Sequence, residues 1–426
     1  MKPRTIALIS AMSMLGATAV PIGLLAQNSR EQVRYSLTDL GTLGGTFSIG
    51  HGINDKGWVL GFSTLPGDQE TRATLWVQGR KIDLGTLGGA NSEAFYGPSD
   101  SGWVAGSAET STPDPLDQQP CFYGSYLTCL PFVWRDGVMT ALPTLGGSFG
   151  NAFNVNNLGQ VVGAAASAAP DPTCAGQPII QGFQPVLWKN GHVLELPTIA
   201  GDPDGLAAGI NDKGQAVGGT GNCAQANNLQ TTHAVLWENG AATDLGSLGG
   251  TTYSFAENIN NLGQVVGVSN ISGDTTSHAF LRQNGVMTDL GTLAGDSFSD
   301  AHWINDNGQV VGLSCDTNGN CRAFRWQNGV MTDINELTHA GSPLYALEAL
   351  EINMRGEIVG YGLQLSTGDI HAFLATPLAG ENVGASIAPG VRNDASQSVK
   401  NALPQNVREF LQRRAIFGGR SAIRNP

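Results

Sequence analysis

Asp83-Leu84-Gly85-Thr86-Leu87-Gly88-Gly89 is the stretch that decides the fold, because the chain repeats it. Successive copies begin between 44 and 58 residues apart. A repeat of this length is typical of propellers, solenoids and other repeat arrays. The six other copies, three nearly full and three divergent, begin at Asp39, Asp244 and Asp289 and at Ala141, Glu195 and Asp333.

Each repeat contains two predicted β-hairpins. In one repeat, Ser254–Ile259 and Gln264–Val268 flank Asn260-Asn261-Leu262-Gly263, where asparagine can bond its own backbone and glycine can adopt positive φ. Further on, apolar residues flank Asn284-Gly285, which is the strongest short-range hairpin signal. The pattern predicts four short strands per repeat, and no segment between Tyr35 and Leu378 has helical periodicity.

The two ends of the repeat region complement each other. The last repeat stops at Thr376-Pro377 without a fourth strand, whereas Tyr35–Leu40 matches that strand and has no repeat before it. Pairing the two would close a ring, while an open solenoid would need capping repeats instead. The sequence therefore predicts an all-β, seven-bladed β-propeller of four-stranded antiparallel blades over residues 35–378, with the last blade closed by the N-terminal strand.

The strand that ends in Ile-Asn is expected to lie innermost in each blade, since small residues precede this ending and a narrow wedge near an axis needs them. Bulky residues are expected further out, and the tryptophans recur there at Trp76, Trp134, Trp188, Trp237 and Trp326.

The segments outside the repeats have different compositions. Residues 1–26 have a basic start, an apolar stretch and small residues for cleavage, which predicts a signal peptide; an uncleaved anchor is the alternative. Residues 27–34 form a linker. Residues 379–426 predict a flexible basic tail with a short helix over Gln405–Ile416, which either docks on the acidic body or a partner or stays only transiently helical.

Charge and apolar runs limit the partners. The net charge is −13, which argues against nucleic acid because phosphate binding needs a basic face. No second apolar run approaches the ~20 residues of a membrane helix, so we expect no transmembrane domain after signal cleavage. With the predicted signal peptide, we expect a secreted, periplasmic or cell-surface monomer whose partner is an extracellular protein, peptide or glycan.

Six cysteines fit an exported protein. Cys121 and Cys129, like Cys315 and Cys321, are close enough in sequence for local loop disulfides. The remaining two, Cys174 and Cys223, occupy the same kind of loop in successive repeats. We prefer disulfides to free thiols, and no cysteine–histidine spacing predicts zinc.

The chain resembles the HAF-repeat proteins, a family of probable extracellular bacterial repeat proteins. The resemblance rests on His-Ala-Phe at His278 and His371, together with the DLGTLGG stretch and the Ile-Asn-x-x-Gly-Gln-Val-Val-Gly run. It departs at Arg322, which takes the place of the histidine in the sixth repeat. The resemblance implies export and a repeat fold, but no catalytic residue, ligand or cofactor.

The longest variable loop, from Ser107 to Leu130, is the first place to expect binding. It carries Phe122, Tyr123 and Tyr126 between two cysteines, and restrained aromatic loops on a rigid frame often form binding surfaces. A neutral surface insertion is the alternative, because long loops cost little. Binding predicts a contiguous aromatic patch on the face that carries the variable loops.

The central channel is the second place. Two residues before the repeated Ile, the inner strand carries a residue that differs in every repeat, and Glu257 and His302 fall there in adjacent repeats, with Asp300 and Glu351 nearby. A carboxylate beside an imidazole could perform acid–base catalysis, although such a pair more often makes a polar contact. The seven residues at this position are His51, Tyr96, Phe153, Ala208, Glu257, His302 and Leu350.

Other chemistry has weak signals. Asp316-Thr-Asn318-Gly-Asn320 and Asp202-Pro-Asp204-Gly205 slightly resemble calcium loops but lack the late bidentate glutamate. No cofactor is therefore predicted, and calcium is the alternative. His233, His278 and His371 repeat with the fold and predict a structural role. The sequence thus favours an exported binding or interaction module. The alternatives are an extracellular hydrolase or lyase at the channel mouth and a structural cell-surface protein.

Overall fold

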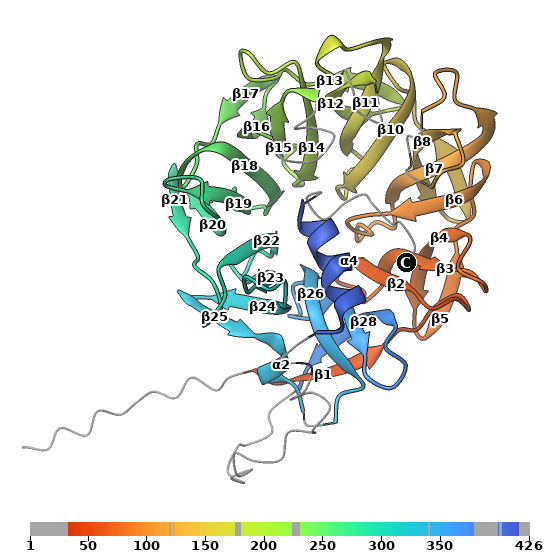
Figure 1. The fold of residues 1–426 in the computed structure, drawn as a ribbon. Coiled ribbons are helices and arrows are strands. Elements are labelled where there is room, and N and C mark those ends of the chain that lie inside the picture. The colour runs from red at the N-terminus through yellow and green to blue at the C-terminus, as the bar shows by residue number, and fades with distance from the viewer. Residues whose placement is uncertain are drawn as a thin grey trace, which may run out of the picture. The chain divides into compact units, whose positions relative to one another are not determined.

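The computed structural model describes residues 33–118, 121, 123–174, 180–223, 231–339, 341–378, 399 and 403–416. Among these residues, the strands form five four-stranded sheets and one eight-stranded sheet. The sheets are arranged around a central axis, and the strands that end in the repeated Ile or Val lie nearest to it; in the last sheet this is β26 (Leu344–Ile352), while β1 (Tyr35–Asp39) lies at the outer edge (Figure 1). The chain is therefore an all-β propeller of mostly antiparallel blades, as the repeat predicted. The predicted signal peptide, most of the linker, and residues 379–398 lie outside the described residues.

Four of the sheets follow the chain order. Each is an up-and-down set of antiparallel strands, so neighbouring strands in the chain are neighbours in the sheet. The sheets comprise β2 (Ser48–Ile53), β3 (Val59–Thr64), β4 (Thr71–Val77) and β5 (Arg80–Asp83); β14 (Asp204–Ile210), β15 (Ala216–Gly221), β16 (His233–Glu238) and β17 (Ala241–Asp244); β18 (Gly249–Ile259), β19 (Val265–Ile271), β20 (Ser277–Gln283) and β21 (Val286–Asp289); and β22 (Phe298–Ile304), β23 (Val310–Cys315), β24 (Cys321–Gln327) and β25 (Val330–Asp333).

The eight-stranded sheet departs from the prediction of seven separate blades. It contains two units of four strands, joined where β8 and β10 form a parallel bridge between Cys129 and Phe149. The bridge forms because β8 begins early, at Leu127, and β10 is ten residues long, so their ends meet. The units are β6 (Gly88–Ala94), β7 (Val104–Pro113), β8 (Leu127–Arg135) and β9 (Val138–Ala141), then β10 (Gly146–Val155), β11 (Val161–Pro170), β12 (Gln181–Lys189) and β13 (His192–Glu195).

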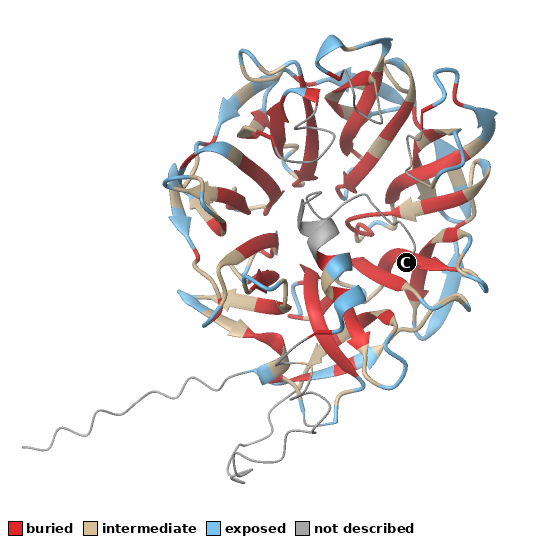
Figure 2. Cartoon of the chain, in the orientation of Figure 1, coloured by how far each residue is buried: buried red, intermediate tan, exposed pale blue. Residues whose placement is uncertain are grey.

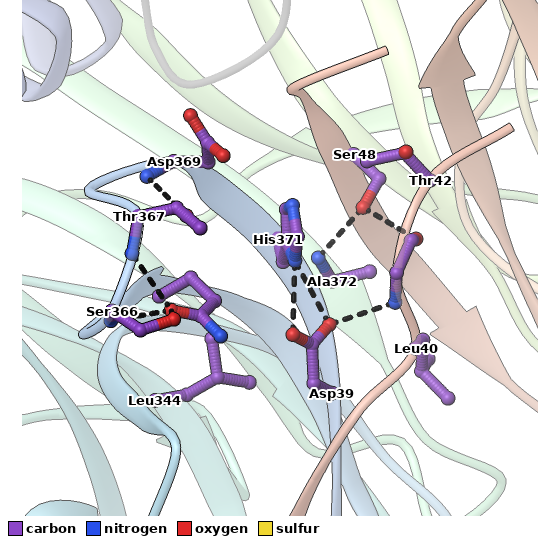
Figure 3. A network of polar contacts seen from close by, with 12 residues as sticks. Asp39, Leu40, Thr42, Ser48, Leu344, Ser366, Thr367, Asp369, His371 and Ala372 are labelled. Carbon is purple, nitrogen blue, oxygen red and sulfur yellow. Dashed lines mark hydrogen bonds and ion pairs between the residues drawn. The ribbon is translucent and has the colours of Figure 1, made fainter. Parts of the chain in front are cut away.

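The last sheet joins the two ends of the repeat region. Strands β26 (Leu344–Ile352), β27 (Ile358–Gln364) and β28 (Ile370–Pro377) are completed by β1 (Tyr35–Asp39), which pairs antiparallel with β28 from Tyr35↔Pro377 to Asp39↔Phe373. The N-terminal strand thus completes the last blade, as predicted. Side chains reinforce it: His371 Nδ1 lies 3.0 Å from the Asp39 carboxylate, and the Ala372 amide donates to Ser48 Oγ at 3.0 Å (Figure 3).

The Asp39–His371 pair also explains the repeated motif. Asp289 and His278 form the same contact at 2.9 Å, and the aspartates accept a hydrogen bond from the glycine two residues on. At Arg322, which replaces the histidine, the guanidinium pairs with Asp333 at 3.3 Å and Asp296 at 2.8 Å. The histidine and the aspartate therefore hold the third strand of a blade to the fourth.

A circle of hydrogen bonds links the turns that follow the inner strands. In six of the turns an asparagine side chain accepts hydrogen bonds from its own turn and donates to the carbonyl of the next turn, and in the remaining turn two serines take its place. The links, at 2.9 to 3.3 Å, run from Asn54 to Ser99, Ser101 to Asn157, Asn156 to Asn211, Asn211 to Asn260, Asn260 to Asn305, Asn305 to Asn353 and Asn353 to Asn54.

The outer hairpins have the geometry that their sequences predict. Asn284 and Gly285 both have positive φ, as do the matching residues of the other Asn-Gly turns. Burial rises toward the axis (Figure 2). Small residues there allow close approach, because a Cβ on Gly52 would lie 1.8 Å from the carbonyl oxygen of Gly97 in the next blade. Trp188 and Trp237 are buried residues of β12 and β16, the third strands of their units, which lie further from the axis.

The six cysteines form the three predicted disulfides, Cys121–Cys129, Cys174–Cys223 and Cys315–Cys321. Cys174, at the end of the 3₁₀ turn η1 (Pro172–Cys174), and Cys223, just after β15, join the loops of two neighbouring blades. The other two disulfides close loops within one blade. Two short helices complete the described chain, α2 (Ile334–Leu337) and α4 (Gln405–Ile416), and α4 has the bounds that the sequence predicted.

Candidate functional site in the central channel

A β-bulge places the variable residue of each inner strand. The register between the first and second strands shifts at His51, Phe153, Ala208, Glu257, His302 and Leu350, which is the position two before the repeated Ile or Val. A bulge leaves one residue out of the ladder and redirects its side chain. The bulged residues therefore differ in chemistry without disturbing the strand pairing.

The structure brings Glu257, Asp300 and His302 together. One ligand atom from each lies within 4.8 Å of the others, and all three residues are buried. Glu348, which sequence reasoning did not single out, joins them, with its carboxylate 2.9 Å from His302 Nε2. The result is a buried cluster of three carboxyl groups around one imidazole.

The cluster determines the charge of its imidazole. Burial favours the neutral ring, but the carboxylates of Asp300, Glu348 and Glu257 outweigh it and raise the pKa of His302 to about 9. His302 is therefore protonated at neutral pH, where it balances part of the negative charge and cannot accept a proton. A metal ion bound to Glu257, Asp300 and His302 would first have to displace that proton.

Two tyrosines donate hydrogen bonds to the carboxylates of this polar cluster. The Tyr96 hydroxyl donates to Glu257 across the channel at 3.1 Å, and the Tyr361 hydroxyl donates to Glu348. The Tyr96 ring also lies 5.4 Å from the ring of Trp303, centroid to centroid. The middle of the channel is thus filled by side chains that contact one another from different blades.

A cavity of about 170 Å³ opens at the end of the channel where the asparagine turns lie. Its walls include the repeated Ile or Val of six inner strands, and its rim includes aspartates of the turns. Trp303 and Glu351 reach it from the position between the bulged residue and the repeated Ile. Burial, Asp100 and Asp55 raise the pKa of Glu351 well above its ordinary value, although the amides of Gly97 and Ile53 donate to its carboxylate.

Two buried amides in this cavity lack hydrogen-bond partners among the described residues. They are Nδ2 of Asn154 and Oδ1 of Asn258, and both side chains are at least 97% buried. Buried polar groups are nearly always hydrogen-bonded, and each exception calls for an explanation such as a ligand. Asn154 and Asn258 therefore mark this cavity as a place where a ligand would complete the hydrogen bonding.

Helix α4 lies at the other end of the channel, across the centre of the ring in Figure 1. Leu403, Val407 and Leu411 are buried against a cluster that includes Ile49 and Leu350 of the inner strands. The Leu403 amide donates to Asn320 Oδ1 in the β23–β24 loop at 3.0 Å. Docking on the propeller was one of the two predicted behaviours of this segment, and the structure has it docked.

A charge on the docked face of α4 should release the helix. Val407→Asp would lose the burial of a valine, about 1.5–3 kcal/mol, and would place a carboxylate in an apolar cluster. We expect trypsin to cleave the variant at Arg408 at least tenfold faster than the parent. The matched control is Asn406→Asp, which adds the same charge at an exposed position and should be cleaved at the parent rate. Equal rates for both variants would show that the helix is not held by this face.

The predicted loop residues have different environments. Tyr126 is 44% exposed, whereas Tyr123 is half-buried and its hydroxyl bonds Glu93. Burial, and then Glu93, raise the pKa of Tyr123 well above its ordinary value. Phe122 lies outside the described residues, so the predicted aromatic patch remains a prediction.

The aspartates of the two calcium-like loops contact other residues of the protein. The carboxylate of Asp316 accepts hydrogen bonds from Asn318 and Asn320, which lower its pKa against the effect of burial. Asp202 contacts His233 at 2.7 Å and Thr220 at 2.6 Å. Burial, and then Asp171, raise the pKa of Asp204 to about 6. These carboxylates form internal contacts in both loops.

Sequence reasoning missed Asn154, Asn258 and Trp303. Their position carries glycine in three repeats, at Gly52, Gly97 and Gly209, and a large residue in the other four. That contrast was visible in the sequence, but its meaning depends on the bulge that turns this position toward the cavity.

The described residues define the chain as a β-propeller with a buried polar cluster in its channel and a cavity at the end where the asparagine turns lie. No family model and no curated protein matches the chain. No helix among the described residues is long and apolar enough to cross a membrane.

Solved structures resemble it at low identity. They include the β-propeller domain of the Trilobed protease from Pyrococcus furiosus (9% identity, TM-score 0.41, covering 83% of this chain and 98% of that one). A puromycin-hydrolysing peptidase from Mycobacterium tuberculosis has 12% identity and a TM-score of 0.43, covering 80% and 56%. A PL25 ulvan lyase has 9% identity and a TM-score of 0.38, covering 87% and 98%. At these scores the similarities bear on neither site nor activity.

Proposed function

We propose that this protein is a binding propeller that holds a small polar ligand in the cavity at the asparagine-turn mouth of its channel. The observation that carries the proposal is the pair of unpaired, buried amides, Asn154 and Asn258, on the wall of that cavity. Small-molecule pockets combine apolar side chains with fixed polar groups, and this cavity combines isoleucine and valine residues with asparagines and aspartates. Counting the eight-stranded sheet as two blades, the frame would be the seven-bladed propeller that the repeats predict.

The experiment exploits the cost of unpaired amides. Replacing Asn258 by leucine should leave the melting temperature unchanged or raised, because a buried polar atom without a partner is lost. The same change should abolish the thermal shift caused by any probe that stabilises the parent protein. The probes are choline, putrescine, glucose and glycine. The matched control is Asn260→Leu, which removes an amide bonded to Gln264 and Asn305 and should lower the melting temperature.

Two outcomes would oppose the proposal. One is that no probe of any class stabilises the parent protein. The other is that Asn258→Leu lowers the melting temperature as much as Asn260→Leu, because Asn258 would then serve the fold.

Binding through the variable loops is a second candidate. It is favoured by Tyr126 and Leu116, two exposed apolar residues on the loop that Cys121–Cys129 restrains. A peptide and glycan array with the parent and with Leu116→Ser combined with Tyr126→Ser tests it, since these exposed residues belong to the loop surface and not to the core of the blade. A hydrolase or lyase would have to use Glu257 and His302 from within the enclosed polar cluster.

We also propose export of the chain as an HAF-repeat protein. The predicted signal over residues 1–26 and the three disulfides support export. The His–Asp contacts of two repeats supply a structural reason for the motif. Mass spectrometry of the secreted protein tests this proposal: cleavage near residue 26 is expected, and an intact N-terminus would contradict it.

A further inference from the structure

The ionisable residues that line the cavity at the asparagine turns are all acidic. Asp55, Asp100, Asp212, Asp306 and Glu351 line it, and no lysine, arginine or histidine is among the described residues that do so. The carboxylates affect one another: burial, and then the charges of Asp55 and Asp212, raise the pKa of Asp100. A negative potential in an enclosed space attracts positively charged ligands.

The rim carboxylates are fixed by the backbone. Asp212 accepts from the Asn157 amide at 2.9 Å, and Asp306 accepts from the Asn261 amide at 2.8 Å. Asp55 likewise accepts from the Met354 amide at 2.8 Å. These bonds hold each carboxylate at the mouth, so little conformational freedom would be lost when a cation arrives.

The walls distinguish an organic cation from a bare metal ion. Calcium takes six to eight oxygen ligands and magnesium about six, and neither ion uses apolar surface. Here the asparagines and carboxylates alternate with six isoleucine or valine residues, and Trp303 adds an aromatic side chain. An aromatic ring attracts an organic cation, and apolar walls accommodate its carbon atoms. The unpaired Oδ1 of Asn258 offers an acceptor for an N–H or O–H group.

We propose that the ligand of this cavity is a small organic cation of the ammonium class, held by the rim aspartates, the Trp303 ring and the amides of Asn154 and Asn258. This inference rests on the proposed function and specifies its ligand. The carboxylates would supply the long-range attraction, and the ring and the amides would supply the contacts.

The test uses pairs of probes that differ only in charge. Choline is compared with its neutral isostere 3,3-dimethyl-1-butanol, and putrescine with 1,4-butanediol, by isothermal titration of the full chain. We expect at least one ammonium probe to bind about tenfold or more tightly than its neutral partner. Raising the salt concentration should weaken that binding, because the rim is open to solvent.

Two variants locate the binding. The double variant Asp212→Asn, Asp306→Asn should weaken binding of the ammonium probe about tenfold and leave binding of the neutral partner unchanged. Trp303→Leu should weaken binding of the ammonium probe roughly 3- to 30-fold. The control is Asp316→Asn, which alters a turn-bound carboxylate in a loop outside the cavity lining and should bind like the parent. Melting temperatures without ligand confirm that each variant is folded.

The outcomes separate the two proposals. If the neutral probe or glucose binds as well as the ammonium, and Asn258→Leu abolishes that binding, the cavity is a ligand site but the cationic class is wrong. If calcium alone binds, the inference is also overturned. If no probe binds, or the ammonium binds equally to all variants, both the site and its ligand class fail.

Discussion

Gly52→Ala is expected to destabilise the propeller by about 3 kcal/mol or more. The added Cβ would lie 1.8 Å from the Gly97 oxygen and 2.5 Å from the Gly97 nitrogen, and both are backbone atoms of the neighbouring blade. A flexible side chain could move aside, but a backbone segment can move only if the two blades separate. Urea unfolding followed by tryptophan fluorescence measures the loss.

Gly50→Ala is the matched control, two residues earlier in β2. There the nearest atoms to an added Cβ are Val59 Cγ1 at 3.3 Å and Gly360 O at 3.4 Å, so a slight shift suffices. We expect this variant to remain within about 1 kcal/mol of the parent, because alanine also restricts the unfolded chain. Equal losses for the two variants would contradict the close blade-to-blade contact at Gly52.

The second large effect concerns pH. Because the pKa of His302 is raised from 6.5 to about 9, its ion pairs contribute fully below pH 6.5, where both states carry the proton. Between pH 6.5 and 9 the unfolded chain releases its proton while the folded one retains it. The parent should therefore lose roughly 3 kcal/mol of unfolding free energy as the pH rises through this window.

His302→Gln should remove most of that dependence. Glutamine is neutral at every pH, so the variant should be less stable than the parent at pH 6, by about 3–5 kcal/mol, because Glu257, Asp300 and Glu348 lose their cation. The difference in unfolding free energy between the parent and His302→Gln should become smaller toward pH 9. Glu351 also loses stabilisation as the pH rises, since its pKa is raised, but it is present in both proteins. His192→Gln, at an exposed position, should follow the parent, and a parallel pH profile for His302→Gln would refute the assignment.

The repeat made most of the fold predictable. Asn-Gly pairs and the Asn-x-x-Gly turns depend on local conformation, which a single sequence carries, so the hairpins and the closing role of Tyr35–Asp39 follow from it. The merging of two blades was not predictable, because it depends on where β8 and β10 begin rather than on the repeat. Helix α4 was predictable from its apolar spacing, but its docking site was not.

The channel was predictable only in part. Glu257 and His302 stood out because they break the repeat at one register, and the structure places them in one cluster. Glu348 could not be paired with His302 from sequence, since the pairing depends on which neighbouring strands face each other across the bulge. Asn154 and Asn258 acquire meaning only once their amides are known to be buried and unpaired.

The pairing of β1 with β28 affects how the chain can fold during synthesis. Tyr35 pairs with Pro377, so the last blade cannot form while β28 is still inside the ribosome. Contacts this distant in sequence form slowly, and the early blades would meanwhile expose an unfilled side. Folding can therefore be completed only after translation has released the last strand.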